Sequence, residues 1–282
     1  ALIFDMQEIG VRYYTYISTL TLVMESAAEK GIPFIVLDRQ NPLDRGINGP
    51  VLDSKFASFV GMHPIPIRHG MTIGELAMMI NEEGWLSDGL KTNLKVIQYR
   101  GNPNELDKSG AFSPPPSPNI PDLETAWNYQ GLCLLEGTNI SEGRGTDRPF
   151  KILGAPWIEN EKLLTAITPF LHKNDQIDTV SFVPRSLPGK STYPKYEDKV
   201  CHGLNIQNLE DPIKWTIHLL KLLASLYPKE FQFLESNFID KLYGSNTLRL
   251  SINEGVDLTQ MILNWETKTD LFRKMSNKYH LY

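Results

Sequence analysis

Residues 1–38 have the sequence ALIFDMQEIGVRYYTYISTLTLVMESAAEKGIPFIVLD and combine two short apolar runs with one amphipathic stretch. Continuous apolar runs at residues 2–5 and 33–38 are typical of strands buried on both faces of a parallel sheet. Between them, apolar side chains recur every three or four positions over residues 16–30, which predicts a helix that Gly31 ends. Strand, helix and strand form a βαβ unit, so the sequence predicts parallel α/β architecture.

The rest of the chain continues to alternate helical and strand patterns. Thr72 and Glu75 have the spacing of a capping box, in which both side chains satisfy free amides at a helix N-terminus, and this helix should end near Gly84. Apolar runs predict buried strands at residues 94–99 and 132–135. The later elements that we expect are helices at about 159–172, 212–226 and 257–277 and short strands near 179–183 and 203–207.

This order of elements suggests two lobes. We expect a Rossmann-like, parallel-sheet lobe over residues 1–130 and an α/β or α+β lobe over residues 131–282. The chain starts at once with a strand pattern and shows no leader, so we expect a truncated or processed chain whose first lobe lacks its first segment. In open parallel sheets ligands bind at the carboxyl ends of the strands, and candidate residues are therefore sought there.

Composition argues against several classes of function. Of the 282 residues, 41% are hydrophobic and 22% are charged, and the net charge of -5 comes without a basic stripe for nucleic acid. No apolar run approaches the roughly 20 residues that span a bilayer. The two cysteines and six histidines show neither CxxC nor HExxH spacing. We expect no nucleic-acid partner, no membrane span in this chain, no metal and no cofactor.

The loop EGTNISEGRGTDRPF, residues 136–150, has the strongest concentration of reactive side chains. Glu136 and Glu142 supply carboxylates, and Arg144 supplies planar donors that match a carboxylate or phosphate. The glycines among them allow tight turns and close approach to a ligand. The alternative interpretation is a solvated surface loop whose charges pair locally.

A second candidate segment follows the strand predicted at residues 33–38. Asp38 stands where this strand meets its loop, and Arg39 and Asn41 come directly after it. In parallel α/β proteins this position commonly carries functional side chains, so Asp38 could accept a hydrogen bond from a sugar or act on a proton. Alternatively, Asp38 and Arg39 simply cap the strand end.

Glu75 and His69 lie close to the N-terminus of the predicted helix that Thr72 caps. The free amides there favour an anionic ligand, which makes Glu75 a conceivable catalytic acid. The capping-box spacing favours a structural role for this glutamate instead. His69 fits a role in holding the backbone as well as a contact with substrate.

Several motifs taken together resemble one bacterial family. They are FDMQEIGVRYYTYISTL (4–20), VLDRQNP (36–42), GMHPIPIRHGMTIGELA (61–77), PSPNIP (116–121), EGTNISEGRGTDRPF (136–150), GAPW (154–157) and YHLY (279–282). The chain resembles the exo-acting β-N-acetylmuramidases of the NamZ type, formerly a domain of unknown function, DUF1343. The resemblance runs from the first residues to the last in the same order.

The resemblance implies a Rossmann-like lobe and a smaller second lobe with the active site in the cleft between them. It implies hydrolysis that releases N-acetylmuramic acid from the non-reducing end of peptidoglycan fragments, so the expected partners are peptidoglycan-derived muramyl saccharides. From this family and substrate we expect an extracytoplasmic protein, periplasmic or secreted. The oligomeric state is left open.

Glycoside hydrolysis generally needs one carboxyl group as acid and another as nucleophile or base. We predict that Glu142 or Glu136 acts as general acid or base, with a partner at Asp38 or on a segment that precedes this chain. N-acetylmuramic acid carries a lactyl carboxylate, which Arg144 is predicted to recognise. The further residues predicted to position the sugar are Asn139, Arg39, Asn41 and His69. Retention, inversion and assistance by the substrate's own acetamido group all stay open.

Two other classes of function compete with this one. The glycine-arginine loop could hold a phosphate, which would make the protein a sugar-phosphate or nucleotide enzyme, although GxxxxGK[ST] and GxGxxG are both absent. The protein could also be a non-catalytic module that binds cell-wall glycans. Such a module would tolerate loss of the glutamates, whereas a glycosidase would lose turnover by orders of magnitude.

Overall fold

The computed structural model describes residues 1–100, 112 and 114–282. The chain forms two compact units: the first unit is Ala1–Ser109 with Leu263–Tyr282, and the second unit is Gly110–Ile262. The last division between them falls within helix α8 (Thr259–Ser276). The boundary expected between residues 130 and 131 stays a prediction.

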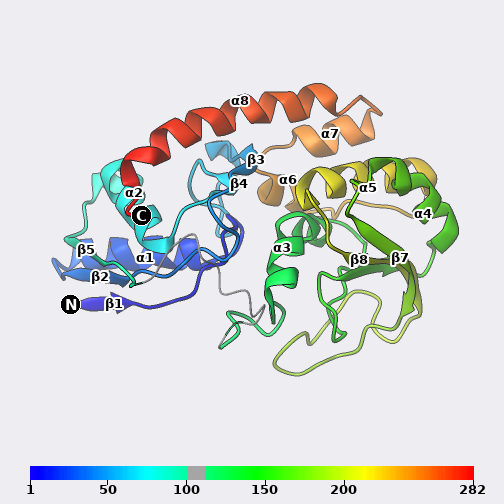
Figure 1. Ribbon diagram of the computed structural model, residues 1–282, viewed down its shortest axis with the longest axis horizontal. Helices are drawn as coiled ribbons and strands as arrows, with labels where there is room; N and C mark the ends of the chain where they lie inside the picture. The colour runs from blue at the N-terminus through cyan, green and yellow to red at the C-terminus, as the bar shows by residue number, and fades with distance from the viewer. Residues whose placement is uncertain (101–111, 113) are drawn as a thin grey trace. The chain divides into compact units, whose positions relative to one another are not determined.

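The first unit is built on a parallel sheet of order β1-β2-β5, seen beside the N-terminus in Figure 1. The predicted strand-helix-strand unit is confirmed, with each end within two residues of its expected position. A short antiparallel pair, β3 with β4, precedes α2. The elements are β1 (Leu2–Phe4), α1 (Tyr16–Glu29), β2 (Phe34–Leu37), β3 (Asn48–Val51), η1 (Ser54–Phe56), β4 (Pro66–Arg68), α2 (Ile73–Glu82), η2 (Ser87–Gly89), β5 (Leu94–Ile97) and, after α8, η5 (Asn277–Tyr279).

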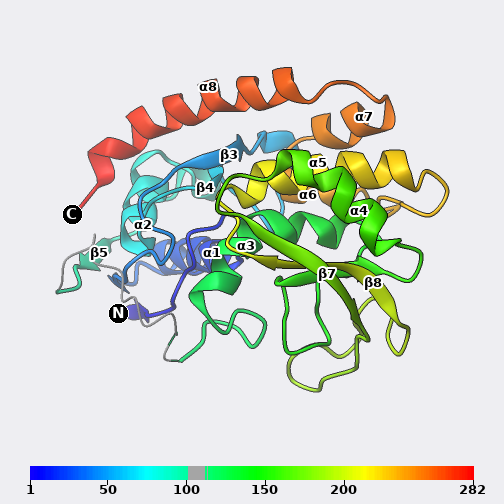
Figure 2. The same ribbon diagram turned by 45° about the vertical axis from the view of Figure 1, so that its right-hand side comes forward.

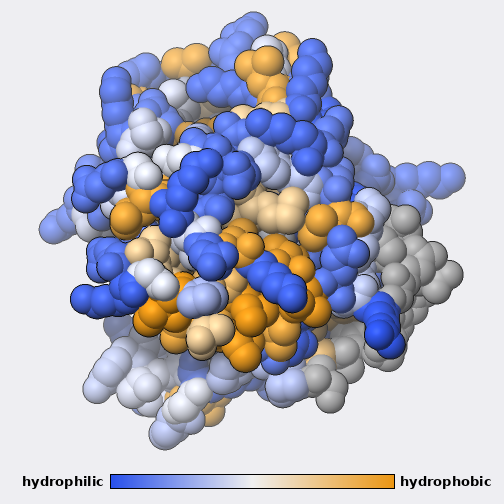
Figure 3. All heavy atoms as spheres, turned by 90° about the vertical axis from the view of Figure 1, so that its left-hand side faces the viewer, coloured by the Kyte–Doolittle hydropathy of each residue, from blue (hydrophilic) through white to orange (hydrophobic). Residues whose placement is uncertain are grey.

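The two faces of this parallel sheet differ in burial. Phe34 and Val36 of β2 are fully buried and join a core formed with α1 and α2. Alternate residues of a strand point to opposite faces, and on the other face Ile3 is 64% and Ile97 40% exposed. Apolar residues also gather on the surface of the side of the molecule where β1, β2 and β5 lie (Figure 3).

The second unit is built on an antiparallel sheet of order β6-β8-β7, and α4 and α5 pack beside β7 and β8 in both ribbon views (Figures 1 and 2). The three late helices and two short strands expected from the sequence are confirmed, and an antiparallel sheet with helices gives the α+β form of the prediction. The elements are α3 (Leu123–Leu132), η3 (Cys133–Gly137), β6 (Ile152–Ala155), α4 (Asn160–Ile167), η4 (Thr168–Phe170), β7 (Gln176–Phe182), β8 (Cys201–Gln207), α5 (Pro212–Leu226), α6 (Phe238–Tyr243) and α7 (Thr247–Asn253).

The predicted strand at residues 132–135 is wrong. These residues end α3 and begin the 3-10 helix η3, and all four side chains are at most 1% exposed. A short apolar run that is buried on every side has the same pattern in a strand and in a helix. Asp122 marks the true element, because its side chain accepts a hydrogen bond from the Thr125 amide at 2.8 Å and caps α3.

Candidate functional site

The loop after η3 is an ordered part of the second unit. Thr138 forms a β-bridge with Phe233, and Ser141 forms another with Gly154 of β6. Hydrogen bonds of 2.9 and 3.0 Å join the amide and carbonyl groups of Ser141 and Gly154 in both directions. The loop is therefore fixed on two sides and holds its side chains in defined positions.

Two glycines allow the loop to turn as the sequence suggested. Gly143 and Gly145 have φ angles of +80° and +81°, a region that residues with side chains rarely adopt. A Cβ atom on Gly143 would lie 2.7 Å from the carbonyl oxygen of Arg148. At Gly145 it would lie 2.7 Å from Pro194, so this glycine lets a distant segment approach the loop.

Arg144 connects the two glutamates of the loop. Its Nη2 atom donates to Oε1 of Glu136 at 2.8 Å, and its Nε atom lies 3.5 Å from Oε1 of Glu142. The guanidinium also lies over the ring of Phe150, 5.1 Å from the centroid, which adds a cation–π contact. The structure thus places Glu136, Glu142 and Arg144 together, and their roles in catalysis and binding stay predictions.

A lysine that the sequence did not single out completes this cluster. Lys195 donates to Oε2 of Glu142 at 3.0 Å and to the carbonyl oxygens of Leu135 and Ile140 at 2.8 Å each. An ammonium group has three protons, so these three acceptors satisfy it fully. Lys195 follows Pro194, which packs against Gly145, so tertiary contacts between segments distant in sequence bring it to the loop.

The two carboxyl groups have different surroundings. The side chain of Glu136 is 24% exposed, whereas that of Glu142 is 5% exposed and faces two cations. Burial raises the pKa of Glu136, and the charge of Arg144 acts against this rise. The carboxylate of Glu136 in turn raises the pKa of Arg144 despite the opposing effect of burial. Glu136 is thus the carboxyl group that both meets solvent and holds a proton more readily than an ordinary glutamate.

Asn139 has a structural position in the same loop. Its Nδ2 atom donates to the carbonyl oxygen of Glu230 at 2.7 Å, and its Oδ1 atom accepts from the amide of Gln232 at 3.0 Å. Both ends of its carboxamide are therefore used to hold the segment after α5. Its predicted contact with the sugar stays a prediction.

Asp38 lies in the first unit and binds the N-terminal end of α2. It accepts hydrogen bonds from the Thr72 hydroxyl at 2.8 Å, the Gly74 amide at 2.7 Å and the Tyr282 hydroxyl at 3.0 Å. The side chain is nearly buried, and burial raises its pKa against the effect of these hydrogen bonds. A Cβ atom on Gly74 would lie 2.6 Å from the Asp38 carboxyl carbon, so glycine is required for this approach. These contacts favour a structural role for Asp38, which stands at the end of β2 and accepts hydrogen bonds from the N-terminal end of α2.

The capping-box interpretation of Glu75 is confirmed. The Thr72 side chain accepts from the Glu75 amide at 3.2 Å, and the Glu75 side chain accepts from the Thr72 amide at 2.9 Å. Glu75 also accepts from Arg45 at 3.1 Å and from the amide of Leu281 at 2.9 Å. This fully buried glutamate therefore joins the C-terminal residues to α2.

The other predicted binding residues of the first unit have local partners. Arg39 pairs with Asp5 at the surface, where both side chains are close to half exposed. Asn41 donates to the Met71 carbonyl at 3.0 Å and accepts from the Leu43 amide at 2.9 Å. Asn41 thus holds a turn, and Arg39 is the more accessible of the two.

His69 is fully buried and faces a glutamate that the sequence analysis missed. Its Nδ1 atom accepts from the Met71 amide at 3.2 Å, and its Nε2 atom lies 3.4 Å from Oε1 of Glu8. Glu8 also accepts from the amides of Gly10 and Val11 at 2.6 and 3.0 Å. This arrangement favours the backbone-holding role of His69.

Within residues 1–100, 112 and 114–282, no group of three or more His, Cys, Asp or Glu side chains is placed to hold a metal ion. In the same residues no helix has both the length and the apolar character needed to cross a membrane.

Comparison with known families identifies the chain. Residues 1–124 match the N-terminal domain, and residues 127–282 the C-terminal domain, of the family described as exo-beta-N-acetylmuramidase NamZ. The chain belongs to the NamZ family. A peptidoglycan beta-N-acetylmuramidase NamZ from Bacillus subtilis (strain 168) is 38% identical over 288 residues, which cover 100% of this chain and 67% of that protein.

Solved structures of NamZ relatives, catalogued as DUF1343 proteins of Bacteroides fragilis, share the fold. One superposes with a TM-score of 0.81 at 33% identity, and the match covers 100% of this chain and 75% of that structure's chain. Another superposes with a TM-score of 0.88 at 29% identity, and the match covers 100% of this chain and 74% of that structure's chain. The expected α/β fold class and the resemblance drawn from the motifs are both confirmed.

The second unit thus brings some of the predicted residues together, and other predicted residues belong to the first unit. Glu136, Glu142 and Arg144 form one cluster in the second unit, which Lys195 completes. Asp38 belongs to the first unit, where Tyr282 is its unpredicted partner. The sequence analysis used the YHLY motif at residues 279–282 only for the family resemblance and did not connect this tyrosine with Asp38.

Proposed function

We propose that this chain is an exo-acting β-N-acetylmuramidase that releases N-acetylmuramic acid from the non-reducing end of peptidoglycan fragments. Membership of the NamZ family supports this activity, and the B. subtilis relative is named for it. The observation that carries the proposal is the pair of glutamates bridged by Arg144, with Glu136 in η3 and Glu142 in the loop after it. Neither the phosphate-handling enzyme nor the wall-binding module requires such a pair.

Glu136 is the proton carrier in this proposal. A general acid must reach the glycosidic oxygen and must be protonated near the working pH. Glu136 is the more exposed of the two glutamates, and burial raises its pKa. Glu142 faces Lys195 and Arg144, so it provides fixed negative charge and holds both cations in place.

Arg144 is the specificity residue of the proposal. Its Nε and Nη2 atoms face Glu142 and Glu136, and its side chain is 31% exposed. We assign recognition of the lactyl carboxylate to the Nη1 edge of the guanidinium, because the two glutamates lie against Nη2 and Nε and a guanidinium presents donors on more than one edge. N-acetylglucosamine has no such carboxylate and gains nothing from this contact.

The activity test compares two isomeric disaccharides. N-acetylmuramic acid should be released when it stands at the non-reducing end, and the isomer with N-acetylglucosamine at that end should stay intact. Glu136→Gln should lower turnover by about 10²–10⁴-fold, the usual contribution of general acid catalysis. Glu159→Gln is the matched control, because the Glu159 side chain belongs to the same unit and is 68% exposed.

Three results would separate the candidate functions. Full turnover in Glu136→Gln would remove Glu136 from the catalytic role. No release by the unchanged chain, with tight binding of the disaccharide, would favour the wall-binding module. Cleavage of both isomers would contradict the role of Arg144. Since peptidoglycan attached to the wall lies outside the cytoplasm, we also propose an extracytoplasmic location, periplasmic or secreted, which fractionation of cells would test.

A further inference from the structure

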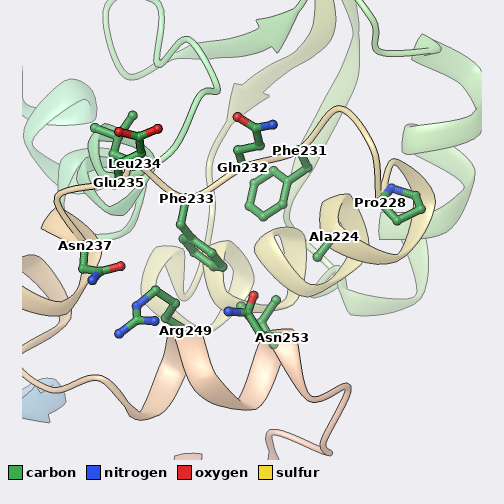
Figure 4. A pocket seen from close by; sticks show the side chains of 11 residues that line it. Ala224, Pro228, Phe231, Gln232, Phe233, Leu234, Glu235, Asn237, Arg249 and Asn253 are labelled. Atoms are coloured by element: carbon green, nitrogen blue, oxygen red, sulfur yellow. The ribbon is translucent and has the colours of Figure 1, made fainter.

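A pocket of about 630 Å³ opens in the second unit between the segment that follows α5 and helix α7 (Figure 4). Small-molecule sites commonly measure about 300–1,000 Å³, so one or two sugar rings would fit. The pocket has aromatic, carboxamide and charged side chains on its walls. None of the residues assigned to catalysis above lines it.

One wall of this pocket is fixed to the catalytic loop. The Asn139 amide donates to the Gln232 carbonyl at 3.0 Å, and the Leu234 amide donates to the Gly137 carbonyl at 3.0 Å. With the Asn139 side-chain contacts described above, these bonds hold the wall in an extended form beside the residues that directly follow Glu136. A preorganised wall lowers the cost of binding a ligand.

The apolar part of the pocket is an aromatic shelf. The rings of Phe231 and Phe233 lie edge to face with centroids 5.3 Å apart. Phe231 is 8% exposed and supports Phe233, whose ring projects toward Arg249 and Asn253 of α7 (Figure 4). A pyranose ring has an apolar C–H face, and a partly exposed aromatic ring such as that of Phe233 is a suitable surface for it.

The polar part of the pocket matches an uncharged ligand. Asn237 and Asn253 offer carboxamides, which donate and accept hydrogen bonds as sugar hydroxyl and acetamido groups do. Arg249 is bound by Asp240, with Nε at 2.9 Å from Oδ1 and Nη2 at 2.6 Å from Oδ2, so its charge is compensated. Glu235 adds a negative charge to the rim, which disfavours an anionic ligand.

We propose that this pocket is a second saccharide site that binds a neutral N-acetylated hexose of the N-acetylglucosamine type. This proposal rests on the proposed function, because the N-acetylhexose would come from the same alternating glycan from which N-acetylmuramic acid is released. Its lining distinguishes it from the Arg144 cluster, which selects the sugar with a carboxylate. The two sites together would bind a chain of both sugars.

The test uses N,N′-diacetylchitobiose, which has two N-acetylglucosamine units and no lactyl carboxylate, in calorimetric titrations of the whole chain. Phe233→Ala should weaken binding by about fivefold or more, and Asn253→Ala should weaken it by about two- to threefold. Phe59→Ala, at a 52% exposed phenylalanine of the first unit, is the matched control and should bind as the unchanged chain does. Circular dichroism verifies that each variant is folded.

Glu136→Gln separates this proposal from the proposed function, because it should lower release of N-acetylmuramic acid by about 10²–10⁴-fold and leave chitobiose binding intact. No binding by the unchanged chain, or equal affinities for the Phe233 and Phe59 variants, would overturn the saccharide site. If the Glu136→Gln variant bound free N-acetylmuramic acid more tightly than chitobiose, and if adding Phe233→Ala to that variant removed its preference for N-acetylmuramic acid, the assignment to a neutral sugar would be wrong. Intact chitobiose binding without muramic acid release by the unchanged chain would refute the proposed function alone.

Discussion

Replacing Lys195 with methionine should destabilise the second unit through Glu142. The methionine fills most of the lysine's volume but leaves a carboxylate that is 5% exposed with Arg144, 3.5 Å away, as its remaining cation. Breaking a buried ion pair by removing one partner commonly costs about 3–5 kcal/mol. Because the Lys195 side chain is 26% exposed and water can partly replace it, we expect a loss near the lower end, about 3 kcal/mol. The melting temperature should then fall by about 6–12 °C.

A double-mutant cycle in chemical denaturation measures this interaction directly. Glu142→Gln removes the charge that needs Lys195, so the double variant should be more stable than the sum of the single changes predicts, by about 2 kcal/mol. The control cycle uses Lys162 and Glu159, whose atoms are 3.1 Å apart, against 3.0 Å for Lys195 and Glu142, but whose side chains are 44% and 68% exposed. The exposed pair should show no measurable coupling. If the two cycles gave the same coupling, burial would not govern the strength of the Lys195–Glu142 pair.

Three further predictions concern other contacts of the structure. Gly143→Ala should lower the free energy of unfolding by about 2 kcal/mol, since the residue has φ of +80° and a Cβ atom would meet backbone; a denaturation midpoint equal to that of the unchanged chain would contradict this strain. Tyr282→Phe should cost about 1 kcal/mol by removing the hydrogen bond to Asp38, and an unchanged stability would show that the C-terminal contact contributes nothing. Turnover should be high below the raised pKa of Glu136 and fall as the pH rises through it, because only the protonated carboxyl can donate; a rate that rises over the same pH range would assign Glu136 to the base instead.

Local patterns were sufficient to predict most of the secondary structure. The run at residues 33–38, the helical spacing at 16–30 and the capping box at Thr72 and Glu75 are all patterns of residues that are close together in the sequence. The glycines of the loop could also be interpreted from the sequence, because Gly143 adopts a backbone conformation that few other residues accept.

Tertiary contacts explain what the sequence could not predict. Lys195 reaches Glu142 across 53 positions of the chain, and Tyr282 reaches Asp38 across 244 positions, so neither pair leaves a periodic or spacing signal. The sequence also does not show whether a polar side chain binds backbone or a ligand. Asn139 and Asn41 have the residue type of sugar-binding groups, yet both carboxamides bind backbone in the structure.

The Arg144 cluster has a physical asymmetry that suits acid catalysis. It contains two carboxylates and two cations, so its formal charge is zero, but the cations are not shared equally. Glu142 faces both Lys195 and Arg144, whereas Glu136 faces Arg144 through a single hydrogen bond and meets solvent. Protonation of Glu136 therefore weakens one hydrogen bond of the cluster and leaves both ion pairs of the buried Glu142 in place. The proton can be taken up and given away at low cost to the fold, which is the property that a general acid needs at each turnover.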